Sequence, residues 1–405
     1  MMKKTTEFDA NFMQEANRLK RLPPYLFAVI DQLIKQQKAT GKDIIDLSMG
    51  SPDLPPPPNV VAALAEGVKS AEMHGYSRHD GEVERKLRKA IADWYHRKFN
   101  VELNPDTEVV TLIGSKEGLA HLSLGFLNND DIALVPSPTY PIHFNGVIMA
   151  GGILYQLPLL AENNFLPIVN NLDPHVVRQS KLMILSYPHN PTAATCDIGF
   201  MQSMVDWCKR HHIILAHDFA YSDFVYDGHK APSVFNAKGA KDVAIEFHSF
   251  SKSYSMAGWR LAFAVGNASI LKTLSKTKSY IDFGIFRAVQ LAGIEALNGP
   301  QDTVKQAADT YYQRMKLFAE GMNAMGWQTP MPKATFYIWA HIPPKYSALN
   351  SMEFSQLMIE EVGVACAPGT GFGEYGEGYV RFAMVQGEER LKQALKRISQ
   401  MLSAG

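Results

Sequence analysis

Short apolar runs alternate with longer amphipathic stretches through the middle of the chain. Each run is bounded by glycine or polar residues, which is typical of strands buried on both faces. The runs are VVTLI at 109–113, IALVP at 132–136, LMILS at 182–186, IILAHD at 213–218, VAIEFHS at 243–249 and LAFAVG at 261–266. Because helical patterns lie between the runs, the sequence predicts an α/β domain with a mainly parallel sheet flanked by helices.

Both ends of the chain have helical periodicity. Near the N-terminus, apolar residues recur at helical spacing from Leu26 to Ile34, and Gly41 is placed to end that helix. Residues 388–402, EERLKQALKRISQML, form a second amphipathic pattern, and the proline-rich stretch SPDLPPPPNV at 51–60 is the nearest feature to a break. We therefore expect a smaller α+β domain built from both chain ends around a large central domain. The expected boundaries give an N-terminal part at 1–54, a large domain at 55–295 and a C-terminal part at 296–405.

Composition narrows the class of protein. A chain of 405 residues that is 46% hydrophobic can bury a large core. Its 40 basic and 40 acidic residues balance, which argues against a nucleic-acid or acidic-membrane partner. No apolar run approaches the roughly 18 residues of a membrane span, and Glu7 and Asp9 come before any apolar stretch, so we expect a cytoplasmic protein.

The cysteines do not indicate a covalent or metal framework. The sequence contains 3 of them, at Cys196, Cys208 and Cys366. Their odd number and wide spacing fit neither a set of disulfides nor a paired-cysteine zinc site. We expect them to be reduced and buried.

Residues that can bind a ligand or take part in a reaction follow the predicted strands. In open α/β sheets, ligands bind beyond the carboxyl ends of the strands. In chain order, the segments that follow the runs are GSKEG at 114–118, SPTYP at 137–141, YPHNPT at 187–192, FAY at 219–221 and SFSKSYSMAGWR at 249–260. The last segment surrounds Lys252 with serines and places Arg260 at the start of the next strand. One edge of the sheet thus gathers a glycine–serine turn, an aromatic ring, an amide, a carboxylate, a phenol, a lysine and an arginine.

This set suits a phosphorylated pyridine aldehyde. The start of a helix at GSKEG, together with Ser249, Ser251 and Arg260, can hold a phosphate. Asp218 can keep a pyridine nitrogen protonated, because a nearby negative charge favours the charged form. Lys252 is an amine able to form a Schiff base with an aldehyde.

The remaining residues at this edge suit the ring itself. Tyr221 and Asn190 can donate to a ring oxygen, and Tyr140 can stack on the face of the ring. The ligand that these groups describe together is pyridoxal 5'-phosphate.

Several motifs carry a family resemblance. With NPT at 190–192, DFAY at 218–221 and SFSKSYSMAGWR at 249–260, the chain resembles the fold-type I, class I/II pyridoxal-phosphate aminotransferases from about residue 46 to 385. IGSKEGLAHL at 113–122 and APGTGFGEYGEGYVRF at 367–382 are similar, more narrowly, to the bacterial glutamate–pyruvate (alanine) transaminase branch. That branch is related to the LL-diaminopimelate aminotransferases.

The resemblance implies a role for each site residue. Lys252, Asp218 and Tyr221 would be catalytic, with Lys252 as the Schiff-base lysine. The implied cofactor-binding residues are Ser115, Lys116, Tyr140, Asn190, Asp218, Tyr221, Ser249, Ser251, Lys252 and Arg260. Arg381 would hold the substrate α-carboxylate, with Gly50 and Asn190 in the same pocket. Tyr76 would reach the phosphate of the neighbouring subunit, which implies a homodimer with shared active sites.

The sequence departs from the family at two places. GEVERKLR at 81–88 lacks the usual proline and is two residues longer, which puts the local geometry near Tyr76 in doubt. Ala193 stands where many members have glycine after NPT, a change that we expect to have little effect.

The expected activity is amino transfer between an L-amino acid and a 2-oxo acid in two half-reactions, with L-glutamate and pyruvate giving 2-oxoglutarate and L-alanine. Alternatives are an LL-diaminopimelate or aspartate aminotransferase, a pyridoxal-phosphate carbon–sulfur β-lyase, and a non-catalytic cofactor-binding regulator. A dicarboxylic substrate needs a second cation, for which Arg21, Arg78 and Arg287 are unranked candidates.

Two other motifs do not indicate sites. GFGEYG at 371–376 fits G-x-G-x-x-G but leads into a strand-like segment, whereas a dinucleotide fingerprint requires a helix there. His211, His212 and His217 lie near Asp218, but adjacent strand positions face opposite sides of a sheet, so His217 and Asp218 do not readily share an ion. We therefore expect no metal site.

Overall fold

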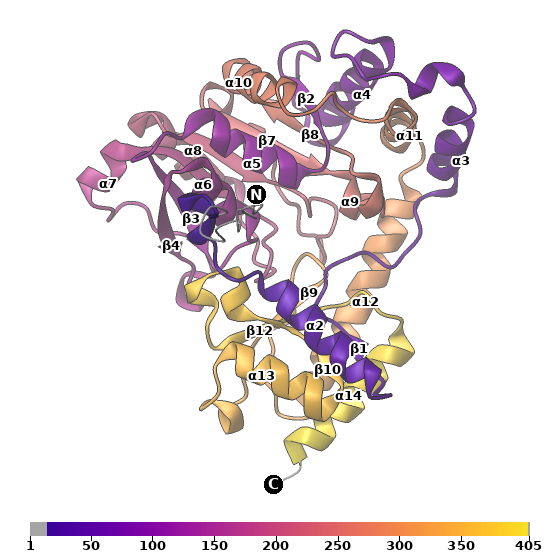
Figure 1. Ribbon diagram of the computed structural model, residues 1–405, viewed down its shortest axis with the longest axis vertical. Helices are drawn as coiled ribbons and strands as arrows, with labels where there is room; N and C mark the ends of the chain where they lie inside the picture. The colour runs from indigo at the N-terminus through magenta and orange to yellow at the C-terminus, as the bar shows by residue number, and fades with distance from the viewer. Residues whose placement is uncertain (1–13, 404–405) are drawn as a thin grey trace, which may run out of the picture.

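A seven-stranded sheet forms the centre of the upper part of the molecule (Figure 1). The computed structural model describes residues 14–403. In spatial order the strands are β2 (Val109–Leu112), β8 (Ala262–Gly266), β7 (Ala244–Ser249), β6 (Ile214–Asp218), β5 (Ser180–Leu185), β3 (Ile132–Ser137) and β4 (Ile153–Pro158). β8 alone runs in the direction opposite to that of the other strands. The prediction of a mainly parallel sheet is confirmed, and each predicted apolar run forms one of its strands.

Strand β4 was not predicted. It lies at the edge of the sheet, and most of its residues are partly or fully exposed. Its sequence, ILYQLP, therefore lacks the continuous apolar character by which the inner strands can be recognised.

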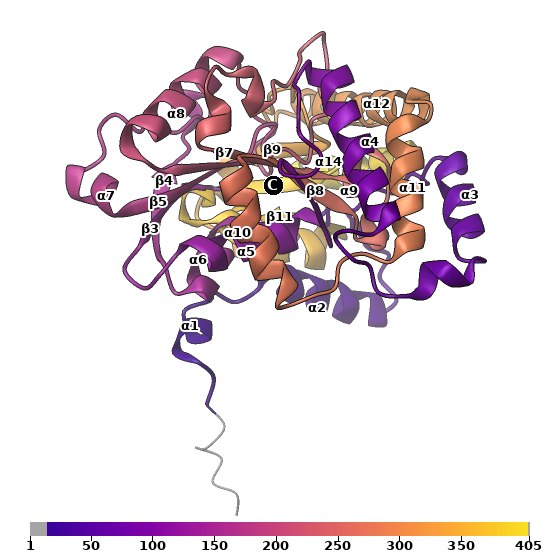
Figure 2. The same cartoon turned by 90° about the horizontal axis from the view of Figure 1, so that it is seen from above.

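Helices cover both faces of this sheet (Figure 2). One face packs against α5 (Ser115–Phe126), α6 (Ile142–Ala150) and α10 (Ala268–Ser279). The other packs against α4 (Glu82–Phe99), α7 (Pro174–Gln179), α8 (Ile198–His211) and α11 (Arg287–Asn298). The remaining helices of this part are α3 (Pro58–Gly67), which packs on α11, and the short α9 (Phe250–Ser253). Because both faces are covered, the inner strands are apolar on both sides.

The lower part of the molecule joins the two chain ends (Figure 1). Its strands are β1 (Ile45–Asp46) paired in parallel with β10 (Val364–Ala365), and an antiparallel sheet of β11 (Ala367–Pro368), β12 (Tyr379–Ala383) and β9 (Tyr337–His341). Its helices are α2 (Leu26–Ala39), α13 (Ser351–Leu357) and α14 (Glu388–Ser403), while α12 (Asp302–Ala324) runs down from the upper part and α1 (Asn17–Lys20) packs against α6. Both predicted terminal helices are confirmed. The division at residues 54/55 and 295/296 stays a prediction.

One apolar core links the two parts. Residues of α12, α14, β9 and β12 pack together with Tyr221, Phe224 and Tyr226, which follow strand β6 of the large sheet. The segment that carries predicted site residues is therefore held between the large sheet and the smaller one.

Cys196, Cys208 and Cys366 are buried free thiols, as expected. Burial raises the pKa of Cys196 and of Cys366 to about 12, so these thiols stay protonated. Between residues 14 and 403, no helix is both long enough and apolar enough to cross a membrane.

Candidate active site

A cavity of about 310 Å³ lies at the carboxyl ends of the parallel strands, facing the smaller sheet. Every residue that the sequence predicts for cofactor or substrate binding lines it, with the exception of Tyr76. These residues are Gly50, Ser115, Lys116, Tyr140, Asn190, Asp218, Tyr221, Ser249, Ser251, Lys252, Arg260 and Arg381. The cavity brings together residues from across the chain, while their individual roles remain predictions.

One end of the cavity is cationic and rich in N–H donors. Gly114 turns the chain from β2 into α5 at φ +83°, so that Ser115 and Lys116 occupy the first turn of that helix. A Cβ on Gly114 would lie 2.1 Å from Nη2 of Arg260, so only glycine leaves room for the guanidinium beside the helix start. The positive end of a helix and a guanidinium together favour a phosphate.

Arg260 does not start the next strand, as the sequence had suggested. It precedes β8 by two residues in a left-handed conformation, φ +55°, and its Nη1 donates to the Ala257 carbonyl at 2.7 Å. This turn directs the side chain back toward α5. On the same side, the Ser249 hydroxyl accepts the backbone N–H of Ser251 at 3.2 Å.

Asp218, at the end of β6, has one oxygen occupied and one free. Its Oδ2 is 3.0 Å from Nε2 of His143, whose Nδ1 is 2.7 Å from the Thr139 hydroxyl. In the neutral tautomer that satisfies both contacts, the imidazole donates to Asp218 and accepts from Thr139. Oδ1 of Asp218 is buried and has no partner among the described residues. Because a buried carboxylate oxygen is costly to leave unpaired, it is suited to a ligand N–H such as that of a protonated pyridine.

His143 was missed in the sequence analysis, although a signal was present. It lies three residues after Tyr140, which is close to one helical turn, in the segment VPSPTYPIH. In the structure Tyr140 lies just before α6 and His143 in its first turn, and their ring centres are 6.1 Å apart.

Lys252 lies at the floor of the cavity. Its Nζ donates to the Gly50 carbonyl at 2.6 Å. Burial lowers the pKa of Lys252 to about 7, and the charge of Arg381 lowers it further while that of Asp218 opposes the shift. A substantial fraction of this amine is therefore neutral near pH 7, as a nucleophile requires.

Arg381, on β12, is buried and has unused hydrogen-bonding capacity. Its Nη1 donates to Oδ1 of Asn190 and its Nη2 to the Ser48 carbonyl, each at 2.7 Å. Its Nε is buried without a partner among the described residues. The guanidinium also lies 4.2 Å from the centre of the Tyr337 ring. A rigidly held arginine with free N–H groups is suited to a carboxylate.

Tyr337 was also missed. It begins β9, and its hydroxyl lies 2.7 Å from that of Tyr221. Burial raises the pKa of both phenols, so both keep their protons. Other cavity residues were not singled out from the sequence, although Ser186, Ala220 and Ala257 lie within its runs and motifs; the full set is Tyr25, Phe27, Met49, Ser51, Ser186, Ala220 and Ala257.

Tyr76 lies away from the cavity of its own chain. It is 75% exposed, and its ring centre is 4.8 Å from that of Phe283, which is 68% exposed. The segment GEVERKLR at 81–88, which differs from the usual family sequence, begins at Gly81, the N-cap residue of α4. Tyr76 is thus presented outward on an exposed aromatic surface.

None of the three candidate arginines for a second carboxylate lines the cavity. Arg21 donates to the Gly152 carbonyl, and Arg287 donates to the carbonyls of Glu72 and Tyr76. Arg78 is exposed beside Asp80. Within one chain, these cations cannot contact a molecule in the cavity.

Ala193 stands where a side chain has a free-energy cost, whereas we expected the change from glycine to have little effect. It adopts φ +58°, a left-handed conformation in which a Cβ costs about 1 kcal/mol. Its N–H donates to the His189 carbonyl at 2.8 Å, which holds the turn closed. Glycine fits this backbone without that cost, which gives a physical reason for glycine after NPT.

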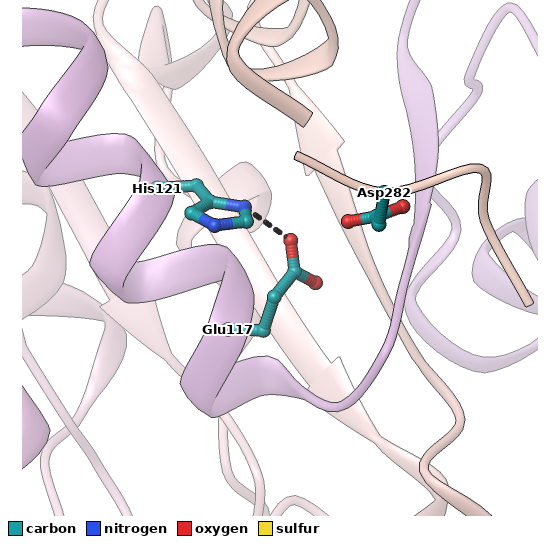
Figure 3. A group of neighbouring side chains, drawn as sticks. All are labelled: Glu117, His121 and Asp282. Carbon is teal, nitrogen blue, oxygen red and sulfur yellow. Dashed lines mark ion pairs between the residues drawn. The ribbon is translucent and has the colours of Figure 1, made fainter. Parts of the chain in front are cut away.

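One cluster of potential metal ligands lies outside the cavity (Figure 3). Glu117, His121 and Asp282 bring their ligand atoms within 4.8 Å of one another. The ammonium of Lys278 is 3.1 Å from Glu117 and 3.0 Å from Asp282, so a cation already neutralises both carboxylates. We interpret the cluster as a network of ion pairs.

The histidines near Asp218 also have other partners. His217 faces away from the cavity, and its Nδ1 is 2.8 Å from the buried Glu246.

The GFGEYG segment forms the short turns η9 (Gly369–Phe372) and η10 (Glu374–Gly376), and β12 follows them. It is therefore not the start of a helix, and the strand–turn–helix context of a dinucleotide site is missing there.

Comparison with known proteins identifies the family. The family described as aminotransferase class I and II matches residues 42–398. The chain is 47% identical over 386 residues to the LL-diaminopimelate aminotransferase of Halothermothrix orenii, covering 95% of this chain and 98% of that one. It is 43% identical over 391 residues to the glutamate-pyruvate aminotransferase AlaC of Escherichia coli, covering 96% and 93%. The substrate-bound structure of BacF from Bacillus subtilis matches with a TM-score of 0.91 at 39% identity, covering 96% and 98%.

The chain belongs to the class I and II aminotransferases. Members of this family use pyridoxal 5'-phosphate, and the residues of the cavity fit that cofactor. The free Oδ1 of Asp218 suits its ring nitrogen, and the Arg260 guanidinium, which packs against Gly114 at the start of α5, suits its phosphate.

Proposed function

We propose that this aminotransferase moves the amino group of L-glutamate to pyruvate, giving 2-oxoglutarate and L-alanine. The observation that carries the proposal is the charge of the cavity wall. Asp218 is the one carboxylate among the described residues that line it, and the cations are Lys116, Lys252, Arg260 and Arg381. Such a wall suits anionic substrates that carry no second ammonium group.

The shape of the wall supports the pyruvate half-reaction. Tyr25, Phe27 and Met49 form an aromatic and apolar side of the cavity, against which a methyl group can be buried. Arg381 would hold the carboxylate that pyruvate and alanine both carry. An LL-diaminopimelate ammonium would need an acceptor in place of this apolar side.

The competing candidate is LL-diaminopimelate. The relative with that name is 47% identical, and the glutamate-pyruvate enzyme AlaC is 43% identical. These values are too close to separate the two substrates, so the charge of the cavity wall decides our preference. An aspartate aminotransferase and a carbon–sulfur β-lyase on the same fold remain outcomes of the test below.

Each site residue would have its own role in the amino transfer. Pyridoxal 5'-phosphate, when bound, supplies an aldehyde that reacts with amines and a ring that accepts the electron pair left at the substrate α-carbon. Lys252, neutral near pH 7, would take the α-proton on Nζ and return it. Asp218 would keep a proton on the ring nitrogen, and Tyr221 and Asn190 would donate to the ring oxygen. Arg381 would orient the α-carboxylate for this transfer.

We further propose a homodimer in the cytoplasm, with active sites shared between subunits. Tyr76 and its neighbours Tyr280, Ile281 and Phe283 form an exposed apolar surface of the kind that marks an interface. Arg287, which donates to the Tyr76 carbonyl, and Arg78 would accompany Tyr76 toward the partner's cavity. There, either arginine could supply the second cation that glutamate needs.

A panel of amino donors tests this function. The holoenzyme is incubated with L-glutamate, LL-diaminopimelate, L-aspartate or cystathionine, each with pyruvate, with 2-oxoglutarate and without an oxo acid. We expect the highest kcat/KM for L-glutamate with pyruvate, with alanine as product, and no turnover by Lys252→Ala. Faster transfer from LL-diaminopimelate or aspartate would overturn the alanine specificity. Pyruvate and ammonia released from cystathionine without an oxo acid would instead identify a lyase.

A further inference from the structure

Two buried tyrosine hydroxyls face each other at the edge of the cavity. We propose that Tyr337 is a positioning residue. Its hydroxyl donates a hydrogen bond to the hydroxyl oxygen of Tyr221, so that the Tyr221 hydroxyl must use its own proton to donate to the ring oxygen of the cofactor. This inference rests on the proposed role of Tyr221. It assigns a function to a residue that no motif in the sequence indicates.

The position of Tyr337 is fixed from several sides. Its side chain is 1% exposed, and its ring lies 4.2 Å from the Arg381 guanidinium. The ring meets that of Tyr221 edge-on, with centres 5.6 Å apart. A Cβ on Gly50 would lie 1.9 Å from the Tyr337 hydroxyl oxygen, so the backbone of Gly50 closes the remaining side. The hydroxyl cannot turn away from Tyr221 without moving these neighbours.

The direction of the hydrogen bond follows from counting protons. Each phenol has a single proton to donate, and the two oxygens are 2.7 Å apart. Either hydroxyl could be the donor in this pair. Once Tyr221 donates to a cofactor oxygen, its proton is used, and Tyr337 must then donate to Tyr221. Tyr337 therefore selects the orientation in which Tyr221 is a donor.

The consequence concerns the charge on the ring oxygen. A hydroxyl that accepts one hydrogen bond becomes a stronger donor in the next, because the bonds polarise one another. Tyr337 would thus strengthen the bond from Tyr221 to an anionic ring oxygen. A better stabilised anion lowers the proton affinity of the nitrogen that joins Lys252 to the cofactor, which keeps this linkage deprotonated at lower pH.

The test is a pH titration of the absorbance of the holoenzyme, without substrate. Tyr337→Phe keeps the ring under Arg381 and removes only the hydroxyl. We expect the midpoint of the titration to rise by about 0.5 to 1 pH unit, the scale of one net hydrogen bond. The matched control is Tyr226→Phe, which removes another buried hydroxyl, bonded to the Thr335 carbonyl, that does not line the cavity. Its midpoint should equal that of the unmodified enzyme.

A double-variant cycle separates this role from a general effect on structure. If Tyr337 acts through Tyr221, then adding Tyr337→Phe to Tyr221→Phe should produce no further shift of the midpoint. A shift of the same size in that background overturns the inference, and so does an unchanged midpoint in the single variant.

A second substitution keeps the test valid if Tyr337→Phe does not fold. Replacing Tyr337 by 3-fluorotyrosine preserves its shape and makes the hydroxyl a stronger donor, so the midpoint should fall rather than rise. An unchanged or raised midpoint would again overturn the inference. Failure of the unmodified protein to bind the cofactor with a titrating absorbance band would count against the proposed function itself.

Discussion

At the scale of single residues, the site depends on polar groups whose partners are incomplete within the protein. Asp218 has one oxygen bonded to His143 and the other buried without a partner, and Arg381 has a buried Nε in the same condition. A folded protein rarely leaves buried polar atoms unpaired, because each costs about 1–3 kcal/mol. Both atoms belong to residues that line the cavity, where polar groups of a ligand can pair with them.

Asp218→Asn gives a prediction at this scale. The amide keeps the size of the side chain but removes the charge that would hold a proton on the ring nitrogen. The cofactor should still bind, while the rate of α-proton removal should fall by roughly a hundredfold to a thousandfold, the scale of about 3 to 4 kcal/mol for one catalytic electrostatic contact. Single-turnover kinetics with L-glutamate, followed by absorbance, measures this step.

The control for that experiment is Asp223→Asn. Asp223 is partly buried in the same segment, where it pairs with Lys98, but it does not line the cavity. Its loss should lower thermal stability and leave the proton-transfer rate of the folded enzyme within a few-fold. A near-normal rate for Asp218→Asn with cofactor bound would show that the ring does not need this charge.

The sequence predicted which residue types gather at the site better than it predicted their contacts. Asp218 ends β6, Lys252 lies in α9 just after β7, and Arg260 lies just before β8, so the topology brings all three to one edge of the sheet. His143 and Tyr337 contact Asp218 and Tyr221 through their side chains, and a hydrogen bond between side chains far apart in sequence leaves no pattern along the chain. For Ala193, the composition of the motif gave no information on φ, which is set by the closed turn after β5.

At the scale of elements, the connection from β2 to α5 shapes the cationic end of the cavity. Buried strands were predictable because both faces are covered and their residues are continuously apolar. The edge strand β4, with its mixed residues, was not. The conformation of Gly114 between β2 and α5 could not be predicted either, because its need for glycine comes from Arg260, nearly 150 residues later in the sequence.

Gly114→Ala tests this connection. The new methyl would displace the Arg260 guanidinium, whose Nη2 lies 2.1 Å from the Cβ position, and would strain a backbone at φ +83°. We expect the affinity for pyridoxal 5'-phosphate to fall at least tenfold, as for loss of a hydrogen bond to a charged group. Equilibrium titration of the apoenzyme with the cofactor measures the effect.

Gly326→Ala is the matched control. Gly326 also requires a positive φ, +86°, but nothing lies within 4 Å of its Cβ position. This variant should lose about 1 kcal/mol of stability through its backbone and keep the cofactor affinity. Equal losses of affinity in both variants would mean that strain, and not the displacement of Arg260, weakens cofactor binding.

At the scale of the whole molecule, the cavity is assembled from distant parts of the chain. The large sheet contributes the strand-end residues, and the unit built from both chain ends contributes Gly50, Tyr337 and Arg381. The pairing of β1 with β10 joins those ends. Sequence periodicity predicted that the ends would come together, but it could not predict which side chains of β9 and β12 would face the cavity, because those strands are buried along almost their whole length.

The last prediction concerns the shared active site. Mixed dimers are prepared from one subunit with Lys252→Ala and one with Tyr76→Phe, carrying different affinity tags so that the heterodimer can be isolated. If Tyr76 serves the partner's cavity, one of the two sites in the heterodimer combines an intact Lys252 with an intact Tyr76. The heterodimer should then have about half the activity of the unmodified dimer, while the Lys252→Ala homodimer has none. The Tyr76→Phe homodimer should have much lower activity than the unmodified dimer. If Tyr76 served its own subunit, the only site with a lysine in the heterodimer would have the low activity of a Tyr76→Phe site. A fully active Tyr76→Phe homodimer would show that Tyr76 serves neither site. Since Tyr76 is 75% exposed and lies outside the cavity of its own chain, we expect the first result.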